Sequence, residues 1–177
     1  MKKVLPLLAI GALTLSACAS AIKKHDFPPT TNAMSEIDRL ETEMKVAQHD
    51  QVNVLSPNNF KSAREKLDHA KTDSQNRESN ADVLNDLGYA KAYLDAANKV
   101  APRAKAAMPE VLTAREDAID AEAVRLKNAD LIDADQELKK TTEDFENGSP
   151  TVSVAKRGEL QKNYMDIELA SIKVDYL

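Results

Sequence analysis

The sequence predicts an all-α protein, built as an antiparallel bundle or as hairpins of about four to five helices with long C-terminal helices. The first observation behind this prediction is composition: the chain of 177 residues has four glycines, no tryptophan and 4% aromatic residues. Ala, Leu, Glu, Asp and Lys dominate, and they favour helix, whereas β-branched and aromatic residues are too sparse for a sheet. The second observation is that apolar residues recur every three or four positions from about residue 33 onward.

The first predicted helix covers 34–50 and is followed by a connector over 51–55. Ser56 and Pro57 predict the next helix start, as N-cap and first-turn proline. The segment 73–78 has no apolar residue and predicts a turn. The two helices have one narrow apolar face each, formed by Ile37, Leu40, Met44 and Ala47 in the first and by Phe60, Ala63, Leu67 and Ala70 in the second.

Ser79 or Asn80 is expected to begin the third helix, whose inner face carries Leu84, Leu87, Ala90, Leu94, Ala97 and Ala101. Pro102 and Pro109 bracket its end; either could end a helix, and Pro102 could instead kink one. From Pro109 the apolar pattern continues to about residue 146, which predicts one helix about 57 Å long.

The predicted long helix has two apolar stripes and is therefore expected to pack on two sides. One stripe holds Leu112, Ile119, Ala123, Leu126, Leu138 and Phe145; the other holds Val111, Ala114, Ala118, Ala121, Ala129 and Ile132. The pairs Asn147-Gly148 and Ser149-Pro150 predict its end and the start of a last helix. That last helix has a row of Leu160, Tyr164 and Ile167 and a second row of Met165, Leu169, Ile172 and Tyr176.

Two short stretches look alike, Ser62-Ala63-Arg64-Glu65 and Thr113-Ala114-Arg115-Glu116. They indicate either an old duplication of a helical hairpin or the small set of residue types from which amphipathic helices are built.

The first residues predict export. Met1-Lys2-Lys3 is a short positive start, and the uncharged run 4–17 has the length of a signal-peptide core, too short for a transmembrane helix of about 20 apolar residues. The segment Leu15-Ser16-Ala17-Cys18 resembles the lipobox of bacterial lipoproteins, in which the cysteine is lipidated and the chain is cut before it. The alternative is an ordinary secretory signal with a chance cysteine. Since Cys18 is the only cysteine and cannot form an intramolecular disulfide, lipidation explains it better.

This resemblance divides the chain into a lipoprotein signal peptide (1–17), a lipidated cysteine and linker (18–32) and a helical domain (33–177). In the enterobacterial sorting rule an aspartate directly after the cysteine retains a lipoprotein in the inner membrane. Ala19 is not that signal, so the resemblance implies the periplasmic face of the outer membrane. The linker contains Pro28-Pro29 and, fully extended over 19–31, reaches about 40 Å.

The charge excludes two classes of partner. Removal of 1–17 takes away two lysines and no acidic residue, so the formal net charge falls from −5 to −7. An acidic body argues against nucleic-acid binding. It also argues against electrostatic attachment to anionic headgroups, so the lipid at Cys18 is expected to hold the protein on the membrane.

The helical pattern resembles an alanine-rich domain of unknown function, found in short bacterial lipoproteins and ahead of OmpA-like peptidoglycan-binding domains. The resemblance covers roughly residues 33–125. No OmpA-like domain is recognised in the remaining residues, so peptidoglycan binding by that route is not implied, and the family brings no catalytic residues. The residues that carry it are Leu55-Ser56-Pro57, Phe60, Ala63, Leu67 and Ala70, then Leu84, Leu87, Ala90, Tyr93-Leu94 and Ala97.

No catalytic, cofactor or metal motif is found. His25, His49 and His69 lack the spacing of zinc ligands. Asp130, Asp133 and Asp135 lack the glycine turn and distal glutamate of a calcium loop, and a solvated face is the preferred interpretation. Neither a phosphate-binding glycine loop nor a G-x-S-x-G elbow is present. An enzyme is therefore not expected, nor a cofactor or a metal.

Two kinds of function remain. The first is a structural, scaffold or interaction protein of the envelope, with another envelope protein as partner. The second is a helical module that binds a lipid, peptide or glycan, in a groove lined by Leu112, Ile119, Leu126 and Phe145. An enzyme would need a buried polar cluster that these patterns do not reveal.

Overall fold

The computed structural model describes residues 22–148 and 151–175, and within them it is all-α with no strand, which confirms the predicted fold class. Cys18 and Ala19, like the whole predicted signal peptide, lie outside the described residues. The helices of this part of the chain are α1 (Ala33–His49), α2 (Val52–Leu55), α3 (Pro57–Gln75), α4 (Asn80–Ala107), α5 (Pro109–Asp120), α6 (Ala123–Leu126), α7 (Asn128–Glu146) and α8 (Val154–Asp175).

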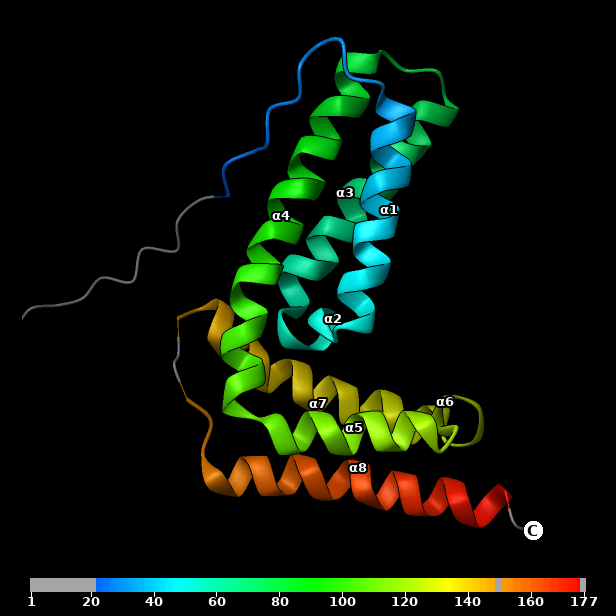
Figure 1. Cartoon of the computed structure of the whole chain (residues 1–177), viewed down its shortest axis with the longest axis vertical. Coiled ribbons are helices and arrows are strands. Elements are labelled where there is room, and N and C mark those ends of the chain that lie inside the picture. The colour runs from blue at the N-terminus through cyan, green and yellow to red at the C-terminus, as the bar shows by residue number, and fades with distance from the viewer. Residues whose placement is uncertain (1–21, 149–150, 176–177) are drawn as a thin grey trace, which may run out of the picture.

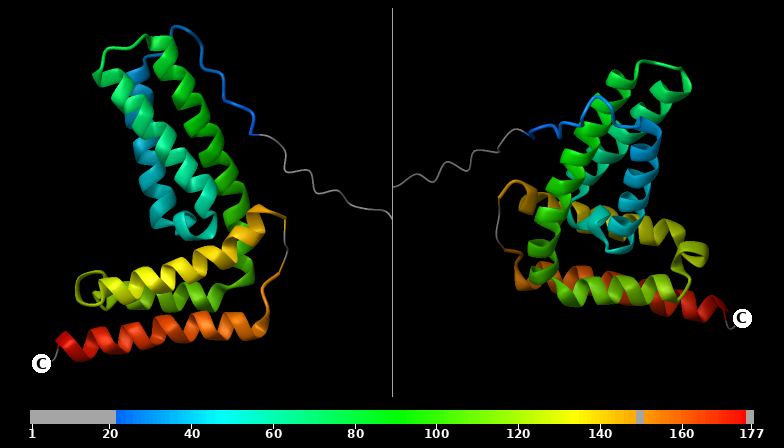
Figure 2. Two further views of the ribbon diagram at one scale, coloured as in Figure 1. Left: turned by 180° about the vertical axis from the view of Figure 1, so that it is seen from behind. Right: turned by 45° about the horizontal axis from the view of Figure 1, so that its top comes forward.

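The helices form two packed units (Figure 1). In the N-terminal unit, α1, α3 and α4 stand side by side, with α2 at their lower end. In the C-terminal unit, α5, α7 and α8 lie across that end, and α7 contacts α2, α3 and α4. The view from behind shows the same two layers (Figure 2). The most extensive packing is between α3 and α4 in one unit and between α5 and α8 in the other.

Both units follow one backbone plan. In the N-terminal unit, α1 ends at His49 and the left-handed residue Gln51 (φ 63°) precedes the single-turn helix α2. The next helix, α3, begins after Ser56 (φ −144°). The C-terminal unit repeats this order 71 positions later. Glu122 (φ 61°) corresponds to Gln51, the single-turn helix α6 corresponds to α2, and Lys127 (φ −137°) corresponds to Ser56. The helices that follow, α3 and α7, have 19 residues each. The structure therefore contains a repeated helix–turn–helix plan.

The two look-alike stretches noted in the sequence do not belong to this repeat. Ser62-Ala63-Arg64-Glu65 lies in α3, whereas Thr113-Ala114-Arg115-Glu116 lies in α5, whose counterpart is α1. Their similarity therefore reflects two amphipathic helices with similar residues, and the repeated plan has a different register.

The predicted continuous helix over 109–146 is wrong. The chain turns back at Ala121 and Glu122, so that each of the two predicted apolar stripes is divided between α5 and α7. No glycine or proline marks this break, because Glu122 itself adopts the left-handed conformation that glycine usually provides. Of the two prolines, Pro102 lies inside α4, which continues to Ala107, and Pro109 begins α5.

The predicted apolar faces of the N-terminal unit are confirmed as core. Those of α1 and α3 are buried, and so are all six predicted inner residues of α4. Several of these are alanines with 0–2% exposure, and their small side chains let the helices approach closely: Ala63, Ala70, Ala90 and Ala97.

Of the two predicted apolar rows of α8, one is buried and the other is exposed. Leu160, Tyr164 and Ile167 are buried. Met165 and Leu169 are each 52% exposed and Ile172 is 39% exposed, while Tyr176 lies outside the described residues. The helix is thus packed on one side only.

Candidate functional site

The predicted flexible linker is docked on the helical body over the part that the structure describes. We call residues 22–32 the strap. The backbone N–H of His25 donates to the carbonyl of Gly88 (3.1 Å), and Lys24 Nζ donates to Asn85 Oδ1 (3.0 Å). Phe27 is half-buried against the core. The strap is therefore a packed segment on α4 rather than a free spacer, which corrects the predicted linker over these residues.

The C-terminal end of the strap is also fixed. Asn80, at the start of α4, donates through its side chain to the Thr31 carbonyl (3.1 Å) and accepts from the Ala33 N–H (3.4 Å). Asn32 caps α1, because its side chain accepts from the Ser35 N–H at 3.1 Å. The start of α1 is thus held by its own cap and by the start of α4.

A buried polar cluster lies at the centre of the C-terminal unit, and the sequence analysis missed it. Arg115 of α5, 8% exposed, makes a bidentate contact with Asp135 of α7 through Nε (2.7 Å) and NH2 (2.8 Å). Tyr164 of α8 donates its hydroxyl to the same carboxylate (2.8 Å), and Arg115 NH1 donates to Gln51 Oε1 (3.1 Å). The only sequence signal was the apolar spacing, which places Arg115 beside Ala114 and Ala118 on the inner side of α5.

The cluster is internally neutralised. Burial opposes the charge on Arg115, but its hydrogen bonds and charge interaction with Asp135 raise the guanidinium pKa above its ordinary value. Burial, with the neighbouring Asp135 carboxylate, raises the pKa of the Tyr164 phenol. Arg115 therefore stays charged and Tyr164 stays protonated, and the cluster joins three helices instead of offering a proton to a substrate.

The predicted acidic set is divided between two surfaces. Asp135 turns to Arg115, whereas Asp130 and Asp133 are exposed and line a shallow acidic groove of about 440 Å³ between α7 and α8, together with Glu137 and Asp166. Among residues 22–148 and 151–175, no three His, Cys, Asp or Glu side chains are placed to hold a metal ion.

A groove of about 690 Å³ lies where the two units meet. The N-terminal unit contributes His49, Gln51 and Asn53, and the C-terminal unit contributes Ile119 and Ile132 among others. The Asn53 Oδ1 atom is buried and has no hydrogen-bond partner in the described part of the chain. The groove has mixed polar and apolar walls.

The groove that was predicted from the long-helix stripe does not form. Leu112 and Phe145 are 3% and 1% exposed and belong to the core. Leu126 is half-buried at the end of α6, and only Ile119 reaches the groove between the units.

The start of α3 is capped from the other unit. Ser56 occupies the predicted N-cap position, but its hydroxyl donates to Glu146 Oε1 of α7 (2.6 Å). The Glu146 carboxylate also accepts from the N–H groups of Asn58 (3.2 Å) and Asn59 (2.9 Å). A carboxylate at a helix N-terminus pairs open N–H groups and favours the helix dipole. Glu146 thus ties the two units together.

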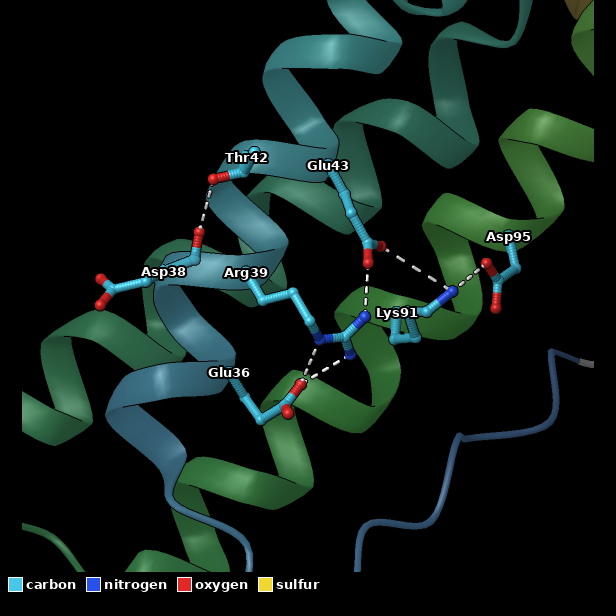
Figure 3. A network of polar contacts seen from close by, with 7 residues as sticks. All are labelled: Glu36, Asp38, Arg39, Thr42, Glu43, Lys91 and Asp95. Carbon is cyan, nitrogen blue, oxygen red and sulfur yellow. Dashed lines mark hydrogen bonds and ion pairs between the residues drawn. The ribbon is translucent and has the colours of Figure 1, made fainter.

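The exposed polar residues form ordinary surface contacts. In the network of Figure 3, Arg39 of α1 contacts Glu36 (2.6 Å) and Glu43, and Lys91 of α4 contacts Glu43 (3.9 Å) and Asp95. The hydrogen bond with Glu36 raises the pKa of Arg39. Exposed pairs of this kind are worth little individually, and here they connect α1 with α4.

The three histidines stay apart. His25 is on the strap and packs edge-on against Phe27, His49 ends α1 beside Asp50 (3.5 Å), and His69 is exposed on α3. His49 lines the groove between the units, but its acidic partner Asp50 is exposed and is not among the residues that line this groove.

A scan against protein-family models finds no match, and searches among curated proteins and among solved structures find none either. The resemblance to the alanine-rich lipoprotein domain therefore remains a prediction. In the described residues, no helix combines the length and apolar character needed to cross a bilayer.

Proposed function

We propose that this protein is an outer-membrane-anchored periplasmic lipoprotein that acts as a structural, scaffold or interaction protein of the cell envelope. The observation that carries the proposal is Leu15-Ser16-Ala17-Cys18 after a short positive start and an uncharged run. Two or three acyl chains at one cysteine would make a stable anchor, whereas one chain binds only reversibly.

The helical body supports a non-enzymatic role. Its most buried charged group, Arg115, joins helices, and the three histidines lie apart on the strap, α1 and α3. Such a body offers surfaces rather than a reaction centre, which agrees with a partner that is another envelope protein.

Labelling with radioactive palmitate tests the anchor. The unchanged protein should incorporate label, and Cys18→Ser should incorporate none and either stay uncut or be released as a soluble periplasmic form. Persistent label in the Cys18→Ser protein would reject the proposal.

The outer-membrane address is tested separately with Ala19→Asp. If the host uses the enterobacterial rule, a sucrose gradient should show a shift of this variant to the inner membrane. An unchanged distribution would reject sorting by this residue while leaving the anchor untouched.

A second candidate is a helical module that binds a lipid, peptide or glycan, and the groove between the units favours it because Asn53 Oδ1 is a buried acceptor without a partner. Native mass spectrometry of protein purified from membranes should then reveal a bound molecule that Ile119→Trp, which fills the groove, displaces. Identical spectra for the two proteins would reject this candidate.

A further inference from the structure

The strap runs antiparallel to the first half of α4. Asn80 contacts Thr31, Asn85 contacts Lys24 and Gly88 contacts His25, so later residues of α4 meet earlier residues of the strap. The left view in Figure 2 shows the strap beside α4, on the side away from α1 and α3. The chain consequently leaves the body along the flank of α4 and not from an end of the helical bundle.

Gly88 makes this docking possible. A Cβ atom built there would lie 2.3 Å from the His25 carbonyl oxygen and 2.9 Å from Lys24 Cγ. The first of these is a backbone atom that cannot move without displacing the strap. Gly158 of α8 is the natural comparison, because a Cβ atom there meets nothing within 4 Å.

Docking of the strap shortens the tether, by which we mean the free chain between Cys18 and the first docked residue. A free segment over 19–31 could span up to about 40 Å, whereas with the strap docked only the three steps from Ala19 to Ile22 are available, and covalent geometry limits them to about 10 Å.

Resting on the proposed lipid attachment at Cys18, we infer that the docked strap holds the body close to the bilayer, with the flank of α4 that carries the strap toward the lipid surface. Release of the strap lengthens the tether about fourfold. A few hydrogen bonds and one half-buried phenylalanine hold the strap, so its opening belongs to the low-stability end of local unfolding. The protein thereby has a near and a far position above the membrane.

The test compares Gly88→Ala with Gly158→Ala in full-length protein purified from membranes. Both changes replace a helix glycine by alanine and favour the helix, but only the first should expel the strap. By hydrogen exchange, the His25 amide should exchange on the order of tenfold faster in Gly88→Ala than in Gly158→Ala. Equal exchange in the two variants, or an unprotected His25 amide in the unchanged protein, would overturn the docked strap. Phe27→Ser, which leaves α4 untouched, is the second variant should Gly88→Ala fold poorly.

The distance of the helical body from the bilayer is measured by fluorescence energy transfer from a donor on the protein to acceptor lipids in phosphatidylethanolamine–phosphatidylglycerol vesicles. With the Cys18 thiol occupied by lipid, a donor can be attached at Asn98→Cys on α4 or at Asp68→Cys on α3. We expect stronger transfer from the α4 position in the unchanged protein and in Gly158→Ala, and weaker transfer from both positions in Gly88→Ala.

Palmitate labelling of the same samples distinguishes a failure of the proposed lipid anchor at Cys18 from a failure of the inference about the strap. Unlabelled protein would overturn the anchor and this inference with it. Labelled protein whose transfer is the same in both glycine variants would overturn the strap inference alone.

Discussion

The two units follow the same backbone plan but fill equivalent core positions with different chemistry. Met44 in α1 and Arg115 in α5 are 71 positions apart, and both are buried, at 5% and 8% exposure. The methionine needs no partner, whereas the arginine requires Asp135, Tyr164 and Gln51. The same backbone plan accepts a charged side chain in its core when each guanidinium nitrogen has a hydrogen-bond partner.

The units also differ in what covers their ends and flanks. Glu146 caps the start of α3, but the start of α7, at Lys127, has no side-chain cap. The strap covers a flank of α4, whereas the outer row of α8 is exposed. The N-terminal unit is therefore stabilised by segments from outside its own three long helices.

The largest expected effect comes from breaking the ion pair. Asp135→Ala should lower the free energy of unfolding by about 3–5 kcal/mol, because it leaves the Arg115 charge buried and unpaired. The triple change Arg115→Met, Asp135→Leu, Tyr164→Phe imitates the apolar solution at Met44 and should recover most of this loss. Urea unfolding measures both, and a triple variant as unstable as the single one would refute the equivalence of the two positions.

Tyr164 should make the protein alkali-sensitive. Its pKa is raised in the folded state, so above about pH 10 the unfolded chain loses this proton first and stability falls as the pH rises. Tyr164→Phe should lose roughly 1.5–3 kcal/mol at pH 7 with the bond to Asp135 but show a shallower decline between pH 9 and 11. Parallel pH profiles of thermal unfolding for the two proteins would contradict this role.

The cap from the C-terminal unit should contribute about 1–2 kcal/mol, as helix caps do. Glu146→Ala removes the acceptor for Ser56 and for two backbone N–H groups. Glu143→Ala on the same helix is the matched control and should change the unfolding midpoint little. Equal shifts of the unfolding midpoint in the two variants would show that the cap does not contribute to the free energy of unfolding.

The left-handed residues that precede α2 and α6, Gln51 and Glu122, provide a direct comparison of the units. Glu122→Gly should stabilise the protein by up to about 1 kcal/mol, since glycine adopts this backbone without strain and the contact with Arg125 is on the surface. Gln51→Gly relieves the same strain but also removes a hydrogen bond to buried Arg115, so it should gain less or lose stability. Thermal unfolding measures the stability of both variants. If Gln51→Gly were more stable than Glu122→Gly, this explanation would be wrong.

The smallest effect is expected on the outer row of α8. Leu169→Ala should change stability by about 0.5 kcal/mol or less, against roughly 2–5 kcal/mol for the fully buried Leu94→Ala. Chemical denaturation of the two variants measures the contrast. A loss for Leu169→Ala close to that for Leu94→Ala would mean that this row is packed in solution.

Local patterns were sufficient for much of the architecture. The spacing of apolar residues correctly predicted the buried faces of α1, α3 and α4, because residues three or four positions apart share a helix face whatever lies opposite. Ser79 and Pro57 marked helix starts correctly, because both act through the backbone of their own first turn.

The sequence by itself thus determined the all-α class, the ends of several helices and their inner faces, all of which depend on neighbours a few residues away. Tertiary structure decided the reversal at Glu122, the burial of Arg115, the cap from Glu146 and the docking of the strap on Gly88. Each of the last three contacts joins residues 20 to 88 positions apart. The reversal occurs without glycine, because the packing of α5 on α8, the packing of α7 on α2 and α8, and the Arg115–Asp135 pair together outweigh the strain of one left-handed residue.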